Sequence, residues 1–190
     1  METEFIKDEN RLGLRSFTEK KQYYLTVGFD DLERKITVSY HVTEYFDLPE
    51  DQFVKLRLTA RRVKDIEGLL RLLAVMRDIT KSNAVATAYQ TLEGMYDRLV
   101  SVPVESFSGG DTVRLVYEER GTRKGSISVF RQSLALMVSF SGFGNRVGFS
   151  YDTVNEMVFP SNKYSKLKDL ASEANQASDV VKLLDELEKS

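Results

Sequence analysis

Hydrophobic and polar residues alternate with a period of two over much of the first 46 residues. Leu25, Val27 and Phe29 are separated by small or polar residues, and the same pattern recurs over 36–41. This period, in segments rich in β-branched and aromatic side chains, is typical of strands that bury one face. We therefore expect antiparallel strands over 12–46.

The pattern changes to helical spacing over residues 49–100. Asp47 followed by Pro49 predicts the start of the first helix, with Asp47 as the capping residue and the proline in the first turn. A second helix is expected over about 84–100. Over 53–60, however, apolar and polar residues also alternate, so a strand that leads into a later helix is the alternative there.

Residues 102–151 return to a period of two, as in Val113, Leu115 and Tyr117. Strands followed by helices and then by further strands predict an α+β fold. We expect an antiparallel sheet of about six or seven strands packed against two central helices, with a C-terminal amphipathic helix. Turns are expected at 30–33, 121–125 and 142–145.

Residues 163–189 carry an apolar seam with alternating spacings of three and four, the pattern of a helix that packs against another element. We expect this seam to contact the protein's own sheet, a second copy of the chain or a protein partner. The predicted domain organisation is a single α+β domain over 1–160, followed by a C-terminal helical arm over 161–190. The seam consists of Leu167, Leu170, Ala174, Ala177, Val181 and Leu184.

The composition removes most of the side chains that enzymes use near pH 7. The chain has no cysteine, no tryptophan and one histidine, His41, in 190 residues. Disulfides and cysteine-ligated metals are therefore excluded, and His41 is expected to be structural or solvated. The glycine-rich segments 108–112 and 142–144 lack the spacing of phosphate-binding loops. We expect no catalytic residue, no metal site, no cofactor and no small-molecule substrate.

Positive charge is concentrated in one part of the chain. Residues 53–81 contain eight lysines and arginines against three acids, hence a local charge of +5 in a protein of net charge −2. Such a cluster can attract phosphates. The alternative is a solvated helix face whose arginines pair with acids from elsewhere in the chain. The expected nucleic-acid or phosphate contacts are Lys55, Arg57, Arg61, Arg62, Lys64, Arg123, Lys124 and Arg146. Aromatic residues that could stack on unpaired bases are Tyr23, Tyr24, Tyr40, Phe143 and Phe149.

These features predict a non-enzymatic macromolecular interaction or assembly protein that self-associates or binds a protein partner through its C-terminal helix. The alternative function is nucleic-acid binding, with a preference for single strands. The N-terminus lacks a basic segment followed by an apolar run, and the longest apolar stretches are far shorter than the roughly 20 residues that cross a bilayer. We therefore expect a cytoplasmic protein without membrane contact.

Overall fold

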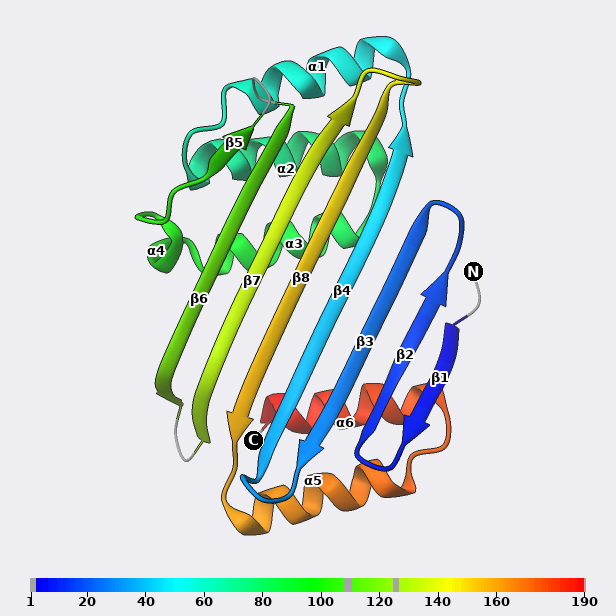
Figure 1. Ribbon diagram of the computed structural model, residues 1–190, viewed down its shortest axis with the longest axis vertical. Coiled ribbons are helices and arrows are strands. Elements are labelled where there is room, and N and C mark those ends of the chain that lie inside the picture. Colours follow the sequence, from blue (N-terminus) through cyan, green and yellow to red (C-terminus); the bar gives the residue numbers. More distant parts are fainter. Residues whose placement is uncertain (1–2, 108–110, 125–126, 190) are drawn as a thin grey trace. The chain divides into compact units, whose positions relative to one another are not determined.

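The computed structural model describes the backbone of residues 3–107, 111–124 and 127–189, and the side chains of these residues apart from 122–130. Within these ranges the chain forms eight strands and six helices, an α+β fold (Figure 1). The strands are β1 (Thr3–Asp8), β2 (Arg11–Phe17), β3 (Lys21–Asp30), β4 (Lys35–Asp47), β5 (Glu105–Phe107), β6 (Thr112–Lys124), β7 (Ile127–Ser141) and β8 (Arg146–Val158). The helices are α1 (Glu50–Arg61), α2 (Ile66–Thr80), α3 (Asn83–Gly94), α4 (Tyr96–Leu99), α5 (Ser161–Glu173) and α6 (Ala177–Lys189).

The eight described strands belong to one antiparallel sheet in the order β1-β2-β3-β4-β8-β7-β6-β5. This is more than the six or seven strands expected from the sequence, and the edge strands β1 and β5 account for the difference. In β1 only Phe5 and Ile6 are half-buried and the other residues are exposed, and β5 is three residues long and exposed. Because neither strand has a buried face, neither has the alternation that predicts a strand.

Two of the three expected turns are present. The turn at 30–33 joins β3 to β4, and the Asp30 side chain accepts hydrogen bonds from two of its backbone N–H groups, at 3.1 and 3.3 Å. The turn at 142–145 joins β7 to β8. The turn expected at 121–125 is wrong for residues 121–124, because they belong to β6; residue 125 lies outside the described residues.

The chain divides into two compact units, each built from several segments. Unit 1 comprises residues 1–41, 118–133 and 152–190, and unit 2 comprises 42–117 and 134–151. The C-terminal helices therefore belong to unit 1 and the central helices to unit 2. Within the described ranges, no helix combines the length and the apolar character needed to cross a membrane.

The core of unit 1 lies between the strands β2, β3 and β4 and the helices α5 and α6. Lys7 of β1 donates hydrogen bonds to the carbonyl groups of Ser172, at 2.7 Å, and Ala174, at 2.8 Å. These bonds satisfy carbonyl groups that the end of α5 leaves without a helical partner. The buried core residues are Leu12, Leu14, Leu25, Val27, Phe29, Ile36, Phe159, Tyr164, Leu167, Ala171, Ala174, Val180, Leu183 and Leu187.

The continuous helix expected over 163–189 is wrong, because the segment forms two helices. α5 ends at Glu173, where Ala174 adopts an extended conformation with ψ of 134°. The Asp179 carboxylate accepts hydrogen bonds from two backbone N–H groups that precede α6, at 2.9 and 3.2 Å, which resembles one half of a capping box. The break contains neither glycine nor proline, so the spacing of the apolar residues runs across it and hides it.

The ambiguous stretch 53–60 is helical and belongs to α1. The helix buries Leu56 and Ala60 and exposes Val54 and Leu58. A strand would have placed all four side chains on one face, since successive side chains of a strand alternate. Helical spacing instead separates them into a buried and an exposed pair.

Two further expectations about the helical segment are wrong. Asp47 does not cap α1: it ends β4, its carboxylate binds Arg146 at 2.9 Å, and Pro49 occupies the N-cap position without a side-chain hydrogen bond. The helix expected over 84–100 is interrupted at Met95 and forms α3 and α4. The described part of unit 2 therefore has four helices rather than two.

Candidate functional site

The basic residues of 53–81 lie on α1, on α2 and on the connection between these neighbouring helices, all within unit 2 (Figure 1). The connection is anchored by the buried side chain of Val63 and by Asp65, which accepts a hydrogen bond from a backbone N–H of α2 at 2.9 Å. Lys64, between these two anchors, and Arg62, just before them, are exposed.

Arg57 is held against the start of β6. Its Nε and Nη2 atoms donate to the two carboxylate oxygens of Asp111 at 2.8 and 2.9 Å, and Arg61 approaches the same carboxylate at 3.7 Å. The hydrogen bond from Arg57 holds the pKa of Asp111 below its ordinary value, and the charges of both arginines add to this effect. The positive charge of Arg57 is therefore largely neutralised within the protein.

We expect Asp111 to make the stability of the protein sensitive to acid. Because its pKa is lower in the folded protein than in the unfolded chain, the unfolded chain binds more protons between the two values. The contribution of Asp111 to the free energy of unfolding is thus present above about pH 4 and is lost as the pH falls through the folded pKa. Asp111→Asn should lower Tm at about pH 6 more than at about pH 2, as measured by circular dichroism. An equal loss at both pH values would contradict this role.

Five other basic side chains of this segment are exposed and have no acidic partner among the described residues. Elsewhere in the described chain, six arginines each lie 2.8–3.1 Å from a carboxylate. The local positive charge of residues 53–81 is therefore only partly neutralised, whereas each of these six arginines has a carboxylate partner. We call the five residues the basic surface: Lys55, Arg62, Lys64, Arg71 and Lys81.

Of the three remaining predicted phosphate contacts, Arg146 is paired with an acid and is not part of the basic surface. Arg146 binds Asp47 through Nε at 2.9 Å and lies 5.6 Å from the centre of the Tyr45 ring. The side chains of Arg123 and Lys124 lie outside the described residues.

The five candidate stacking residues have different environments. Tyr23 and Tyr40 pack edge to face, with ring centres 5.5 Å apart, against the core of unit 1, and burial raises the pKa of Tyr23. Phe149 is buried in unit 2, and Tyr24 is half-buried. Only Phe143 of these five is freely accessible, with 93% of its surface exposed in the turn between β7 and β8.

The six seam residues predicted as partner contacts also separate. Two are buried in the core of unit 1, two pack partly against that core, and two are exposed on α5 and α6. These pairs are, respectively, Leu167 and Ala174, Ala177 and Leu184, and Leu170 and Val181. Most of the seam therefore holds α5 and α6 in unit 1, because the break at 174–176 turns the second half of the seam toward the same core.

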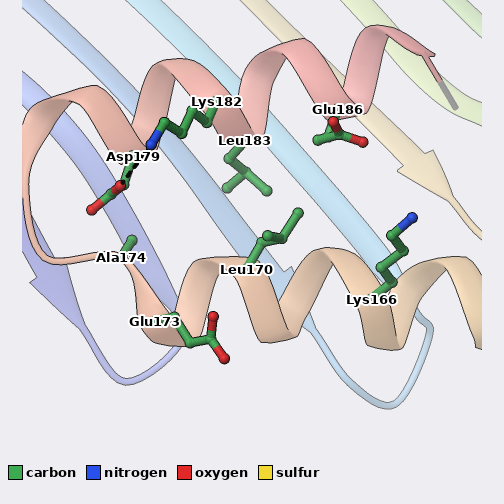
Figure 2. Close-up of a pocket in the computed structure, with 8 residues that line it drawn as sticks. All are labelled: Lys166, Leu170, Glu173, Ala174, Asp179, Lys182, Leu183 and Glu186. Carbon is green, nitrogen blue, oxygen red and sulfur yellow. Dashed lines mark ion pairs between the residues drawn. The ribbon is translucent and has the colours of Figure 1, made fainter.

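A groove runs between α5 and α6 (Figure 2). Figure 2 shows Leu170 and Leu183 pointing toward one another from the two helices. Lys182 at its rim lies 4.0 Å from Asp179. The rim carries charges of both signs, so it has no electrostatic preference for an anionic or a cationic ligand. The charged residues are Lys166, Glu173, Asp179, Lys182 and Glu186.

The only histidine of the chain, His41, makes a hydrogen bond between its Nδ1 atom and the carboxylate of Asp152 on β8, and both side chains are half-exposed. Within the described part of the chain, no three histidine, aspartate or glutamate side chains are grouped closely enough to hold a metal ion.

Sequence reasoning missed Asp111, which neutralises Arg57 from a position 54 residues further along the chain. No local pattern connects the two residues, since only the packing of α1 beside β6 brings them together. It also missed that Val54 and Leu58 are exposed, because their hydrophobic character is typical of buried residues.

Comparisons of the chain with protein-family models, curated proteins and solved structures found no match. Its function is therefore proposed from the geometry and charge of its own residues.

Proposed function

We propose that this protein is a non-enzymatic macromolecule-binding protein whose basic surface binds nucleic acid, preferably single-stranded. The observation that carries the proposal is the set of five exposed cations without an acidic partner among the described residues. Cations that are free of internal partners can neutralise phosphates and release the counterions of the nucleic acid, which is the main source of non-specific affinity. Arginines that are already paired, as most are elsewhere, gain less from a phosphate.

The preference for single strands is supported by Phe143. The turn that carries it lies next to the chain that leads into α1, because the backbone N–H of Leu48 donates to the carbonyl of Asn145 at 3.1 Å. An exposed aromatic ring in the same unit as the basic surface provides a stacking partner for an unpaired base, whatever the base. A duplex keeps its bases stacked and offers no such contact.

Assembly through the C-terminal helix has less support. Of the residues predicted to contact a partner, only Leu170 and Val181 are exposed, and they lie on different helices. A partner would therefore bury little apolar surface there, and we place the binding function on the basic surface instead.

The test is fluorescence anisotropy of a labelled single-stranded oligonucleotide titrated with the protein at two salt concentrations. If the five cations each contact a phosphate, affinity should fall about 100-fold between about 50 and 200 mM salt. The double variant Lys64→Glu/Arg71→Glu should lower affinity at the lower salt by at least about tenfold and flatten the salt dependence.

The matched control is Lys182→Glu/Lys189→Glu on α6, which changes the net charge by the same amount on two exposed lysines. Binding that ignores salt, or an equal loss in the control, would show that the basic surface is not the site. Two further measurements test the preference for single strands. The unchanged protein should bind a duplex of the same sequence more weakly than the single strand. The variant Phe143→Ala should bind the single strand more weakly than the unchanged protein does.

A further inference from the structure

The exposed face of α1 carries two apolar residues that neither the core nor the proposed function uses. Val54 is 45% exposed and Leu58 is 47% exposed, and they lie one helical turn apart on the side opposite Leu56 and Ala60, which are fully buried. The two adjacent side chains form a small apolar patch, in contrast to apolar residues that are exposed singly, and a weak interface can cover a patch of this size.

The two ends of α1 carry opposite charges on either side of these two residues. Glu50 and Asp51 occupy the first turn, whereas Arg61 and Arg62 stand at the end of the helix. From the N-terminus to the C-terminus, the exposed face is therefore acidic, then apolar with the exposed Lys55 beside Val54, then basic. The acids also lie where the helix dipole favours negative charge, so they stabilise the helix as well.

We propose that two copies of the protein associate through α1, with the two helices antiparallel about a twofold axis between Val54 and Leu58. This arrangement places Val54 of one copy against Leu58 of the second copy and the reverse. It also places Asp51 near Arg62 of the second copy, because both lie about one turn beyond the apolar pair. A twofold interface must be self-complementary, and the apolar pair and the two charged ends of this face meet that condition.

The two flanks of the helix decide between antiparallel and parallel association. At 100° per residue, Asp51 and Arg62 lie on one flank of the apolar pair, and Glu50 and Arg61 lie on the other. In an antiparallel pair each flank meets the same flank of the second helix with its direction reversed, so acids meet bases on both sides. A parallel pair would place acids against acids and bases against bases.

The same charge pattern selects a second copy over other occupants of the surface. A nucleic acid or an acidic protein that covered the whole face would bring negative charge against Glu50 and Asp51. A basic protein would meet Arg61 and Arg62. A helix with the reversed order of charges fits both ends, and α1 of a second copy is such a helix.

The dimer is expected to be weak. α1 is 12 residues long and therefore extends about 18 Å, so a pair of these helices buries less than a standard interface of about 800 Å² per partner. Self-association is independent of the basic surface as a whole, because Lys64, Arg71 and Lys81 lie beyond α1. Of the five basic-surface residues, Lys55 and Arg62 lie at the helix pair, and Arg62 is the one that meets an acid of the second copy.

Analytical ultracentrifugation from about 5 to about 500 μM protein tests the proposal. The mass should rise with concentration from that of the 21.7 kDa monomer toward twice this value. Leu58→Asp should stay monomeric throughout, whereas Leu170→Asp, which places the same charge at an exposed leucine of α5, should still dimerise. A monomer at every concentration, or an equal effect of both variants, would overturn the proposal.

A mixing experiment tests the antiparallel pairing itself. Asp51→Lys brings two lysines against Arg62 of the opposite copy, and Arg62→Glu brings two glutamates against Asp51, so each variant alone should be monomeric. An equimolar mixture should form a heterodimer, because both pairs then join opposite charges. Formation of the heterodimer in the mixture also shows that each variant is folded. If either variant dimerises alone as the original protein does, or if the mixture stays monomeric, the pairing is wrong. Oligonucleotide binding is not a readout of either experiment, so the two proposals can fail separately.

Discussion

Replacing Phe149 with alanine is expected to lower the free energy of unfolding by about 3–5 kcal/mol. Phe149 lies on β8, is 1% exposed and stacks on Tyr151, with ring centres 6.5 Å apart. Removing its ring deletes the buried apolar area and leaves a cavity, because the surrounding side chains on strands and helices can close it only in part. The decrease in the free energy of unfolding is measured by urea unfolding followed by far-ultraviolet circular dichroism. This signal is used because the chain has no tryptophan whose fluorescence could report unfolding.

The matched control is Phe143→Ala, the same substitution in the preceding turn. Phe143 is 93% exposed, so its loss should change the free energy of unfolding by no more than about 0.5 kcal/mol. The pair also separates stability from binding: Phe143→Ala should weaken oligonucleotide binding without unfolding the protein. A similar loss of stability in both variants would mean that the two rings do not differ in burial as described.

Replacing Gly13 with alanine is expected to lower the free energy of unfolding by about 3 kcal/mol. Gly13 lies on β2 between Ile6 of β1 and Thr26 of β3. A Cβ atom at this position would lie 2.2 Å from the carbonyl oxygen of Leu25, closer than any real contact. Because the obstacle is a backbone atom of the paired strand, relief requires the two strands to separate locally and weakens their hydrogen bonds.

Gly142→Ala is the control for this substitution. Gly142 has no atom within 4 Å of the position that a Cβ would occupy, and its φ lies outside the left-handed region. Its replacement should change the free energy of unfolding by less than about 0.5 kcal/mol. If Gly13→Ala were equally mild, the close approach of β2 and β3 at this residue would be incorrect.

The order of strand and helix segments, and the α+β class that follows from it, could be predicted from the sequence. Strands that bury one face, such as β3 with Leu25, Val27 and Phe29, carry a period of two that depends only on local geometry. The edge strands β1 and β5 could not be predicted in the same way. Their pairing depends on backbone hydrogen bonds to a neighbouring strand, which leave no pattern of side chains when neither face is buried.

The positive charge of residues 53–81 is visible in the sequence, but its distribution is not. Arg57 is neutralised by Asp111, a residue far along the chain, whereas Lys64 has no acidic partner among the described residues. Ion pairs of this kind depend on which elements pack together, so only the folded structure separates the basic surface from the paired arginines.

The sequence by itself determined where hydrophobic residues repeat with the period of a strand or a helix, and which chemical groups the chain lacks. The tertiary structure alone decided what each repeat contacts. The seam of 163–189 became two helices because Asp179 provides a start for α6 and the core of unit 1 accepts both halves. The alternation of 53–60 became a helix with Val54 and Leu58 outside, because burial is a property of packing between elements and not of the residues themselves.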